Sequence, residues 1–207
     1  MRGRGYNGSR SSDRSRRTLT LVPAKSACWF PPSDVPAPER PDGYWAWLID
    51  PAPLTPKLRA HAGEDLDLTL LQSGPAHPWP DEWPVLDLTP RQRILRREIL
   101  FTVCDDPWVY ATTTVSETDV SSLPWLTQLG NEALGDRVFA RHGGKRLWLE
   151  VGRLGYGAPL ARQARVLLHP NRLPDPLWAR RSLLQCGRAR LLVHEIFLRG
   201  ATPWRRS

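Results

Sequence analysis

The sequence predicts an α+β fold, a six-stranded antiparallel sheet with short helices on one side. Two observations favour this class. Six segments alternate apolar and polar residues, as half-buried strands do. Nearly all of them follow one another through tight turns or short helical segments, whereas parallel strands need a long crossover. The 207 residues suffice for one domain of about 150 residues and an appendage.

The appendage is predicted at residues 1–41, which are rich in Arg, Ser, Gly and Pro. The first 40 residues hold eight Lys/Arg and three acids, so they supply +5 of the formal charge of +8. We expect a disordered extension here and a catalytic domain over 42–207. A nucleic-acid-binding arm and an organelle transit peptide are alternatives to a plain solvated extension.

The first part of the domain should contain short helices and one strand. An aromatic-rich helical turn is predicted at 44–49, followed by a helix with Thr55 as its N-cap that ends before Gly63. Alternating Leu and polar residues predict a strand over 64–72. Five prolines in 73–90 predict an extended surface crossing without regular structure.

A β-hairpin over 94–116, with a turn at 105–107, forms the centre of the predicted sheet. Alternation on its first strand places Arg97 in the middle of an otherwise apolar face. The other residues of this face are Leu95, Ile99, Phe101 and Val103.

The remaining segments complete the sheet. Two short helices broken near Gly130 are predicted over 121–140, and a longer connection with a helical patch over 154–176. A strand over 145–153 should place Leu147, Leu149 and Val151 on one face. A terminal hairpin joins the strands 177–185 and 189–198.

The last strand places Glu195 on an apolar face with Leu191, Val193 and Phe197. A charge removed from water without compensation costs several kcal/mol, roughly, so an inward Arg97 and an inward Glu195 must each find a partner. That partner is the other residue, water or a ligand. We interpret the two side chains as a candidate site, with a plain buried ion pair as the alternative.

Several classes of site are not indicated. The chain has no GxGxxG, P-loop, HExxH or GxSxG motif, and its five histidines are scattered. Three cysteines without a CxxC or zinc-type spacing predict free thiols in a cytoplasmic protein. No apolar run reaches the roughly 18 residues of a membrane span, so we expect no membrane insertion. The small basic excess of the domain suits an anionic ligand and does not require nucleic acid.

Five stretches in order resemble the chorismate pyruvate-lyase family of bacterial ubiquinone biosynthesis, from about Trp45 to the C-terminus. They are LRREIL (95–100), PW (107–108), LGNEALGDRVF (129–139), LWARRS (177–182) and LLVHEIFL (191–198). The resemblance implies a six-stranded antiparallel sheet that encloses the ligand. It further implies a lyase without cofactor or metal that converts chorismate to 4-hydroxybenzoate and pyruvate. We expect the protein to be a monomer.

The resemblance also implies roles for particular residues. Arg97 corresponds to the family's arginine that holds the ring carboxylate, and Glu195 to the glutamate on the 4-hydroxyl side; both are the candidate catalytic residues. Leu134 would supply a backbone contact and part of a lid, and Leu54 a further substrate contact. The chain has Thr112 where many members carry Arg, which bears on how the enolpyruvyl carboxylate is held.

The chemistry agrees with these residues. Loss of the C4 hydrogen and the C3 enolpyruvyl ether makes the ring of chorismate aromatic, so a site has mainly to bind the dianion and hold it in a reactive conformation. We expect Glu195 to orient the substrate first and to act as a base second. A rival hypothesis is a non-catalytic effector-binding domain of the same fold, and a third is a nucleic-acid-binding protein that depends on the Arg-rich tail.

Overall fold

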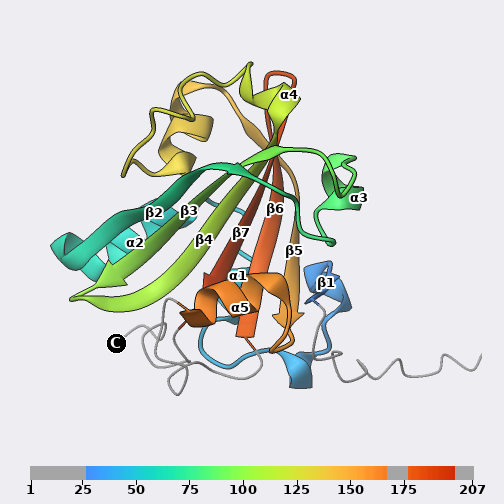
Figure 1. The fold of residues 1–207 in the computed structure, drawn as a ribbon. Coiled ribbons are helices and arrows are strands. Elements are labelled where there is room, and N and C mark those ends of the chain that lie inside the picture. Colours follow the sequence, from blue (N-terminus) through green and yellow to red (C-terminus); the bar gives the residue numbers. More distant parts are fainter. Residues whose placement is uncertain (1–26, 167–176, 199–207) are drawn as a thin grey trace, which may run out of the picture.

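The computed structural model describes residues 27–166 and 177–198. These residues form one antiparallel sheet of seven strands in the order β1-β5-β6-β7-β4-β3-β2 (Figure 1). The antiparallel α+β class is confirmed, and the predicted count of six strands is wrong. The strands are β1 (Ala27–Phe30), β2 (Leu66–Ala76), β3 (Ile94–Val103), β4 (Asp106–Ser116), β5 (Lys145–Leu154), β6 (Leu177–Cys186) and β7 (Ala189–Phe197).

The additional strand, β1, lies in the segment that we assigned to a disordered extension. It pairs with β5 at the edge of the sheet, where Trp29 lies opposite Gly152. A Cβ on Gly152 would come within 2.4 Å of the Trp29 ring, so glycine permits this close approach. Ordered structure therefore starts at Ala27 at the latest, and the disorder predicted for residues 1–26 lies outside the described residues.

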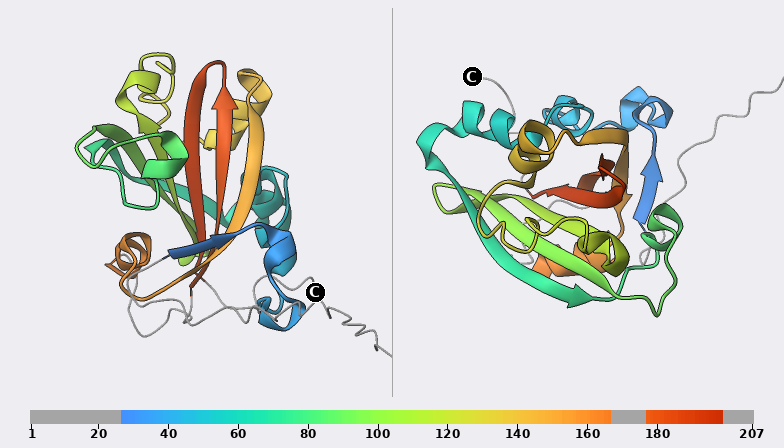
Figure 2. Two further views of the ribbon diagram at one scale, coloured as in Figure 1. Left: turned by 90° about the vertical axis from the view of Figure 1, so that its right-hand side faces the viewer. Right: turned by 90° about the horizontal axis from the view of Figure 1, so that it is seen from above.

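Short helices cover both faces of the sheet, so the prediction of helices on one side is wrong (Figure 2). The first two pack against the face that carries Phe101 and Phe197, and α5 packs against the face that carries Tyr110 and Ile196. Both faces carry buried apolar residues on the middle strands, which is why both need a cover. The helices are α1 (Trp45–Leu48), α2 (Leu54–Ala62), α3 (Trp83–Leu86), α4 (Glu117–Val120), α5 (Pro159–Val166), the 3-10 turns Pro32–Asp34, Ala37–Glu39 and Gly63–Asp65, and a π-helical segment Asp136–Arg141.

Several predicted boundaries move. Helix α2 begins at Leu54, so Thr55 lies inside the helix and is not its N-cap; the N-cap position is Pro53, whose side chain has no hydrogen-bond acceptor. Its end before Gly63 is confirmed, where a φ of 66° stops the helix. The supposed crossing 73–90 instead contains the end of β2 and all of α3. Within 121–140 the two expected helices are replaced by turns and the start of the π-helical segment.

The central hairpin turns one residue earlier than predicted. Cys104 and Asp105 both have positive φ, at 48° and 63°. Two successive positive φ values are typical of the tight hairpin turns whose twist matches that of the strands. Thr112 on β4 is consequently opposite Glu98 on β3, and Thr113 is opposite Arg97.

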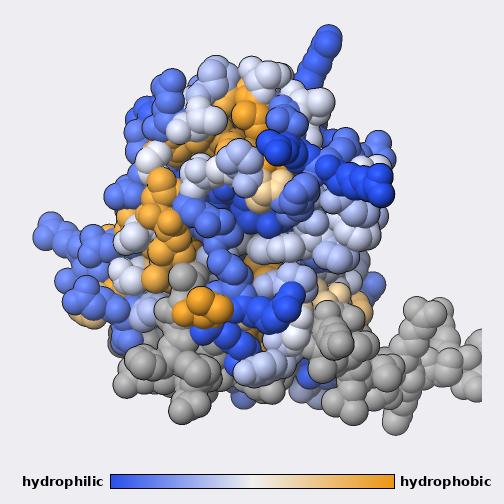
Figure 3. All heavy atoms as spheres, viewed as in Figure 1, coloured by the Kyte–Doolittle hydropathy of each residue, from blue (hydrophilic) through white to orange (hydrophobic). Residues whose placement is uncertain are grey.

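The outer surface is mainly polar. Polar and charged residues cover most of the face drawn in Figure 3, and apolar residues gather in small separate areas. Among the described residues, no helix is long and apolar enough to cross a membrane.

Candidate active site

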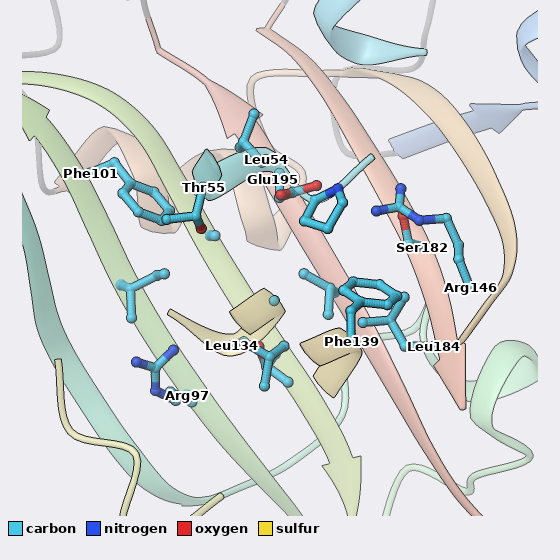
Figure 4. Close-up of a pocket in the computed structure, with 16 residues that line it drawn as sticks. Leu54, Thr55, Arg97, Phe101, Leu134, Phe139, Arg146, Ser182, Leu184 and Glu195 are labelled. Carbon is cyan, nitrogen blue, oxygen red and sulfur yellow. The ribbon is translucent and has the colours of Figure 1, made fainter. Parts of the chain in front are cut away.

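A pocket lies between the sheet and two segments that cover it (Figure 4). One segment is the start of α2, and the other is residues 129–142, which alone we call the lid. Arg97, Arg146 and Glu195 are its charged lining residues. The others are Pro53, Leu54, Thr55, Ile99, Phe101, Ala111, Thr113, Leu134, Gly135, Phe139, Ser182, Leu184 and Val193. The predicted residues Leu54, Arg97, Leu134 and Glu195 thus lie around one space.

Arg97 is a buried cation without a carboxylate partner among the described residues. Its side chain is 2% exposed. Its Nη2 donates to the lid carbonyls of Gly130 and Glu132, both at 2.8 Å, while its buried Nε has no hydrogen-bond partner in this part of the chain. Burial lowers the pKa of Arg97 to about 10, so it stays charged at neutral pH. The guanidinium therefore holds the lid and has donor capacity left for an anion.

The partner of Glu195 is Arg180, a residue to which sequence analysis gave no role. The two lie opposite each other on β6 and β7, and the Arg180 Nε and Nη2 donate to the Glu195 Oε2 and Oε1. Arg180 Nη1 also donates to the carbonyls of Trp47 at 3.0 Å and Asp50 at 2.9 Å. Arg180 therefore fixes the carboxylate and the segment that leads to Leu54. The strand period of two could have predicted this position, because Arg180 shares a face of β6 with Trp178 and Ser182 in the segment LWARRS.

Arg146 enters the pocket because of a β-bulge. The register of β5 against β6 shifts between Arg146 and Trp148. This places Arg146 on the same face as Leu149, whereas Leu147 is 44% exposed, so the predicted common face of Leu147 and Leu149 is wrong. Arg146 Nη1 donates to the Ser182 hydroxyl at 2.9 Å. Its Nε is buried and has no partner among the described residues, and burial lowers the pKa of Arg146.

The charges around the pocket do not balance. Arg97, Arg146 and Arg180 contribute +3 and Glu195 contributes −1, which leaves +2. The nearby Asp50 is compensated by Lys57 at 2.6 Å. A pocket with a net charge of +2 suits a ligand that carries two negative charges. The part of the chain that the structure describes has no group of three or more His, Cys, Asp or Glu residues that could hold a metal ion.

The opposite face of the sheet holds a separate buried network. His194 lies there with Thr112, whose Oγ1 is 3.3 Å from the His194 Nδ1. Burial lowers the pKa of His194 to about 3, so the ring is neutral. The prediction that His194 faces away from Glu195 is confirmed. Thr112 also points away from the pocket, so its departure from the family pattern does not alter the lining.

Glu82 is the fully buried carboxylate of this network. It accepts hydrogen bonds from Arg96 at 2.5 Å and from the Thr114 hydroxyl at 2.7 Å. Burial raises the pKa of Glu82, and the Arg96 charge acts in the opposite direction. These contacts connect α3 to the back of the central strands and stabilise the platform on which the pocket is built.

Comparison with known proteins gives a consistent result. A family model described as chorismate lyase matches residues 24–207. A probable chorismate pyruvate-lyase from Cupriavidus pinatubonensis is 36% identical over 164 residues, which cover 78% of this chain and 83% of the relative. One from Ralstonia nicotianae is 37% identical over 160 residues, covering 75% and 81%.

Among solved structures, the C-terminal domain of PhnF is similar to this chain with a TM-score of 0.50. The sequence identity is 15%, and the match covers 68% of this chain and 86% of that domain. At this identity the likeness concerns the fold alone, an antiparallel sheet with few helices.

Proposed function

The chain belongs to the chorismate lyase family, and we propose from this membership that its pocket is the site where chorismate is converted to 4-hydroxybenzoate and pyruvate. The protein is a lyase that supplies the first aromatic intermediate of ubiquinone biosynthesis. The likeness to the PhnF domain concerns the fold, which does not by itself support the rival effector-binding hypothesis.

The observation that best supports this function is the charge of the pocket. Arg97 is buried, positively charged and without a carboxylate partner among the described residues, and the groups around the pocket sum to +2. Chorismate carries two carboxylates. Binding it would compensate both unbalanced charges in a space lined mainly by buried residues, where electrostatic interactions are strong.

Arg97 in this proposal binds the ring carboxylate with the part of its guanidinium that the lid does not use. The same side chain joins β3 to the lid through Gly130 and Glu132. Substrate binding and lid closure therefore depend on one residue. Leu134 and Leu54 cover the ring from the lid and from α2.

Glu195 in this proposal accepts a hydrogen bond from the 4-hydroxyl group and orients the ring. Both of its oxygens already accept hydrogen bonds from Arg180, which holds the carboxylate in one position. In the reaction the C4–H and C3–O bonds break, the ring becomes aromatic, and the released enolpyruvate takes up a proton to become pyruvate. An orienting Glu195 predicts that Glu195→Gln keeps measurable turnover, and complete loss of turnover in a folded variant would favour a base.

The direct test is incubation of the purified protein with chorismate, with both products followed by chromatography. Equal amounts of 4-hydroxybenzoate and pyruvate from the wild type, and loss of both in Arg97→Ala, are expected. Arg153→Ala is the control, because Arg153 forms an ion pair with Glu39 and does not line the pocket. Binding of 4-hydroxybenzoate without turnover by the wild type would favour the effector-binding hypothesis.

We further propose that the protein acts as a monomer in the cytoplasm. The sheet, the start of α2 and the lid surround the pocket, so this chain by itself supplies a binding space. The three cysteines are unpaired, which fits a reducing compartment.

A further inference from the structure

We propose that Arg146 binds the second carboxylate of the substrate, the one on the enolpyruvyl group. This inference rests on the function proposed above and assigns the residue that distinguishes substrate from the aromatic product, which lacks this group.

The contacts of Arg146 leave it available for an anion. Among the described residues its hydrogen-bond partner is the neutral Ser182 hydroxyl, at 2.9 Å, and it forms no ion pair with any of them. Its Nε is buried without a hydrogen-bond partner from these residues. A planar guanidinium can hold a carboxylate through two parallel hydrogen bonds, and an unpaired buried donor makes that contact favourable.

The strand order places Arg146 on the correct side of the substrate. From β3 to β5 across the sheet, the charged side chains of the pocket follow in the order Arg97, Glu195, Arg146. Figure 4 shows Arg97 and Arg146 on opposite sides of the space. In chorismate the ring carboxylate is on C1, the hydroxyl on C4 opposite to it, and the enolpyruvyl ether on the neighbouring C3. A ring held between Arg97 and Glu195 therefore directs its second carboxylate toward the far side of Glu195.

The other cations near this position are already engaged. Arg180 is fully buried and donates hydrogen bonds to Glu195 and to the backbone carbonyls of Trp47 and Asp50. Arg97 lies at the other end of the pocket, and Lys57 pairs with Asp50. Thr112, the position where many family members carry Arg, lies on the opposite face of the sheet. Arg146 is the cation of the described lining that remains for the second carboxylate.

The backbone also shows that Arg146 is directed into the pocket. In a regular β5 strand, Arg146 would point to the opposite face of the sheet. The bulge between Arg146 and Trp148 turns its side chain to the pocket face. The bulge leaves Leu147 44% exposed, an unfavourable position for a leucine. Bulges next to active sites commonly re-aim a side chain in this way.

A pair of non-reacting ligands tests the inference by binding. The first is 3-(1-carboxyethoxy)-4-hydroxybenzoate, an aromatic compound with a second carboxylate on C3, and the second is 3-ethoxy-4-hydroxybenzoate, which lacks only that carboxylate. We expect the wild type to bind the first at least about tenfold more tightly. In Arg146→Met this preference should disappear, with affinity for the ethoxy compound unchanged.

Kinetics with chorismate give a second readout. Arg146→Met should lower kcat/KM on the order of 100-fold, and Arg146→Lys, which keeps the charge but not the planar fork, by less. Arg153→Met is the matched control, since Arg153 is on the same strand, pairs with Glu39 and does not line the pocket. It should keep kcat/KM close to that of the wild type.

The outcomes separate the two proposals. Wild-type protein that produces no 4-hydroxybenzoate from chorismate would overturn the proposed function. Wild-type turnover with an unchanged rate in Arg146→Met would overturn only the role of Arg146, as would equal loss of affinity for both aromatic ligands. If Arg146→Met fails to fold, the wild-type preference still decides, because equal affinity for the two ligands excludes a carboxylate anchor on that side.

Discussion

Loss of the Arg180 guanidinium alone should destabilise the protein more than loss of the guanidinium together with the charge of its partner, Glu195. Arg180→Met leaves Glu195 as a buried charge without its ion-pair partner, at a cost of about 3–5 kcal/mol. The carbonyls of Trp47 and Asp50 also lose a donor, at about 1 kcal/mol each. The expected loss for the single variant is therefore about 5–7 kcal/mol, a large part of the stability of an ordinary domain.

The double variant Arg180→Met/Glu195→Gln should recover most of the first contribution, because a buried amide has no charge to compensate. Urea unfolding followed by tryptophan fluorescence measures both variants. With a slope of about 2 kcal/mol per M, a recovery of about 3 kcal/mol raises the midpoint of the double variant above that of Arg180→Met by about 1.5 M. A double variant less stable than Arg180→Met would refute the argument.

The neighbouring pair Arg181 and Glu150 is the control for this experiment. It lies one residue further along β6, with a distance of 2.7 Å, but the Glu150 side chain is 26% exposed. Ion pairs in contact with solvent contribute about 0–1 kcal/mol. The coupling in an Arg181→Met/Glu150→Gln cycle should therefore be much smaller than that of Arg180 and Glu195.

Two further predictions concern parts of the fold outside the pocket. Burial lowers the pKa of His194 to about 3. Below about pH 6.5 the unfolded chain therefore binds a proton at this histidine that the folded chain does not bind. The free energy of unfolding should then fall as the pH decreases from 6.5 toward 3, by up to about 1.4 kcal/mol per pH unit. His194→Asn should remove this contribution to the pH dependence of the urea midpoint. His142→Asn, a change at an exposed histidine, should leave it in place. Equal pH dependence in the wild type and both variants would contradict the prediction. Gly152→Ala should destabilise the domain by about 1–3 kcal/mol, because the new Cβ meets the Trp29 ring at 2.4 Å. Gly74→Ala, which meets nothing within 4 Å, is its control in thermal unfolding, and equal melting temperatures would show that β1 yields to the methyl group.

The strands and their facing could be predicted from local sequence because a period of two residues depends on each strand alone. Alternation placed Arg97 and Glu195 inward, and both line the pocket. Gly63 marked the end of α2 for a similarly local reason, since its φ of 66° is one that glycine adopts without cost. The strand β1 was missed, because four residues within a proline-rich, basic segment give too short a pattern to recognise.

Which strands are neighbours is a property of the assembled sheet, so the sequence alone did not predict which charged side chains pair with one another. Arg97 and Glu195 are both inward charges, yet β4 lies between their strands, and Glu195 pairs with Arg180 on the adjacent β6. One inserted residue in β5 reversed the facing of Arg146, an event that strict alternation does not foresee. The amino-acid pattern thus placed Arg97 and Glu195 inward and indicated the family to which the chain belongs. The order and register of the strands decided which charge is compensated and which remain for a ligand, because electrostatic partners are chosen by distance in space.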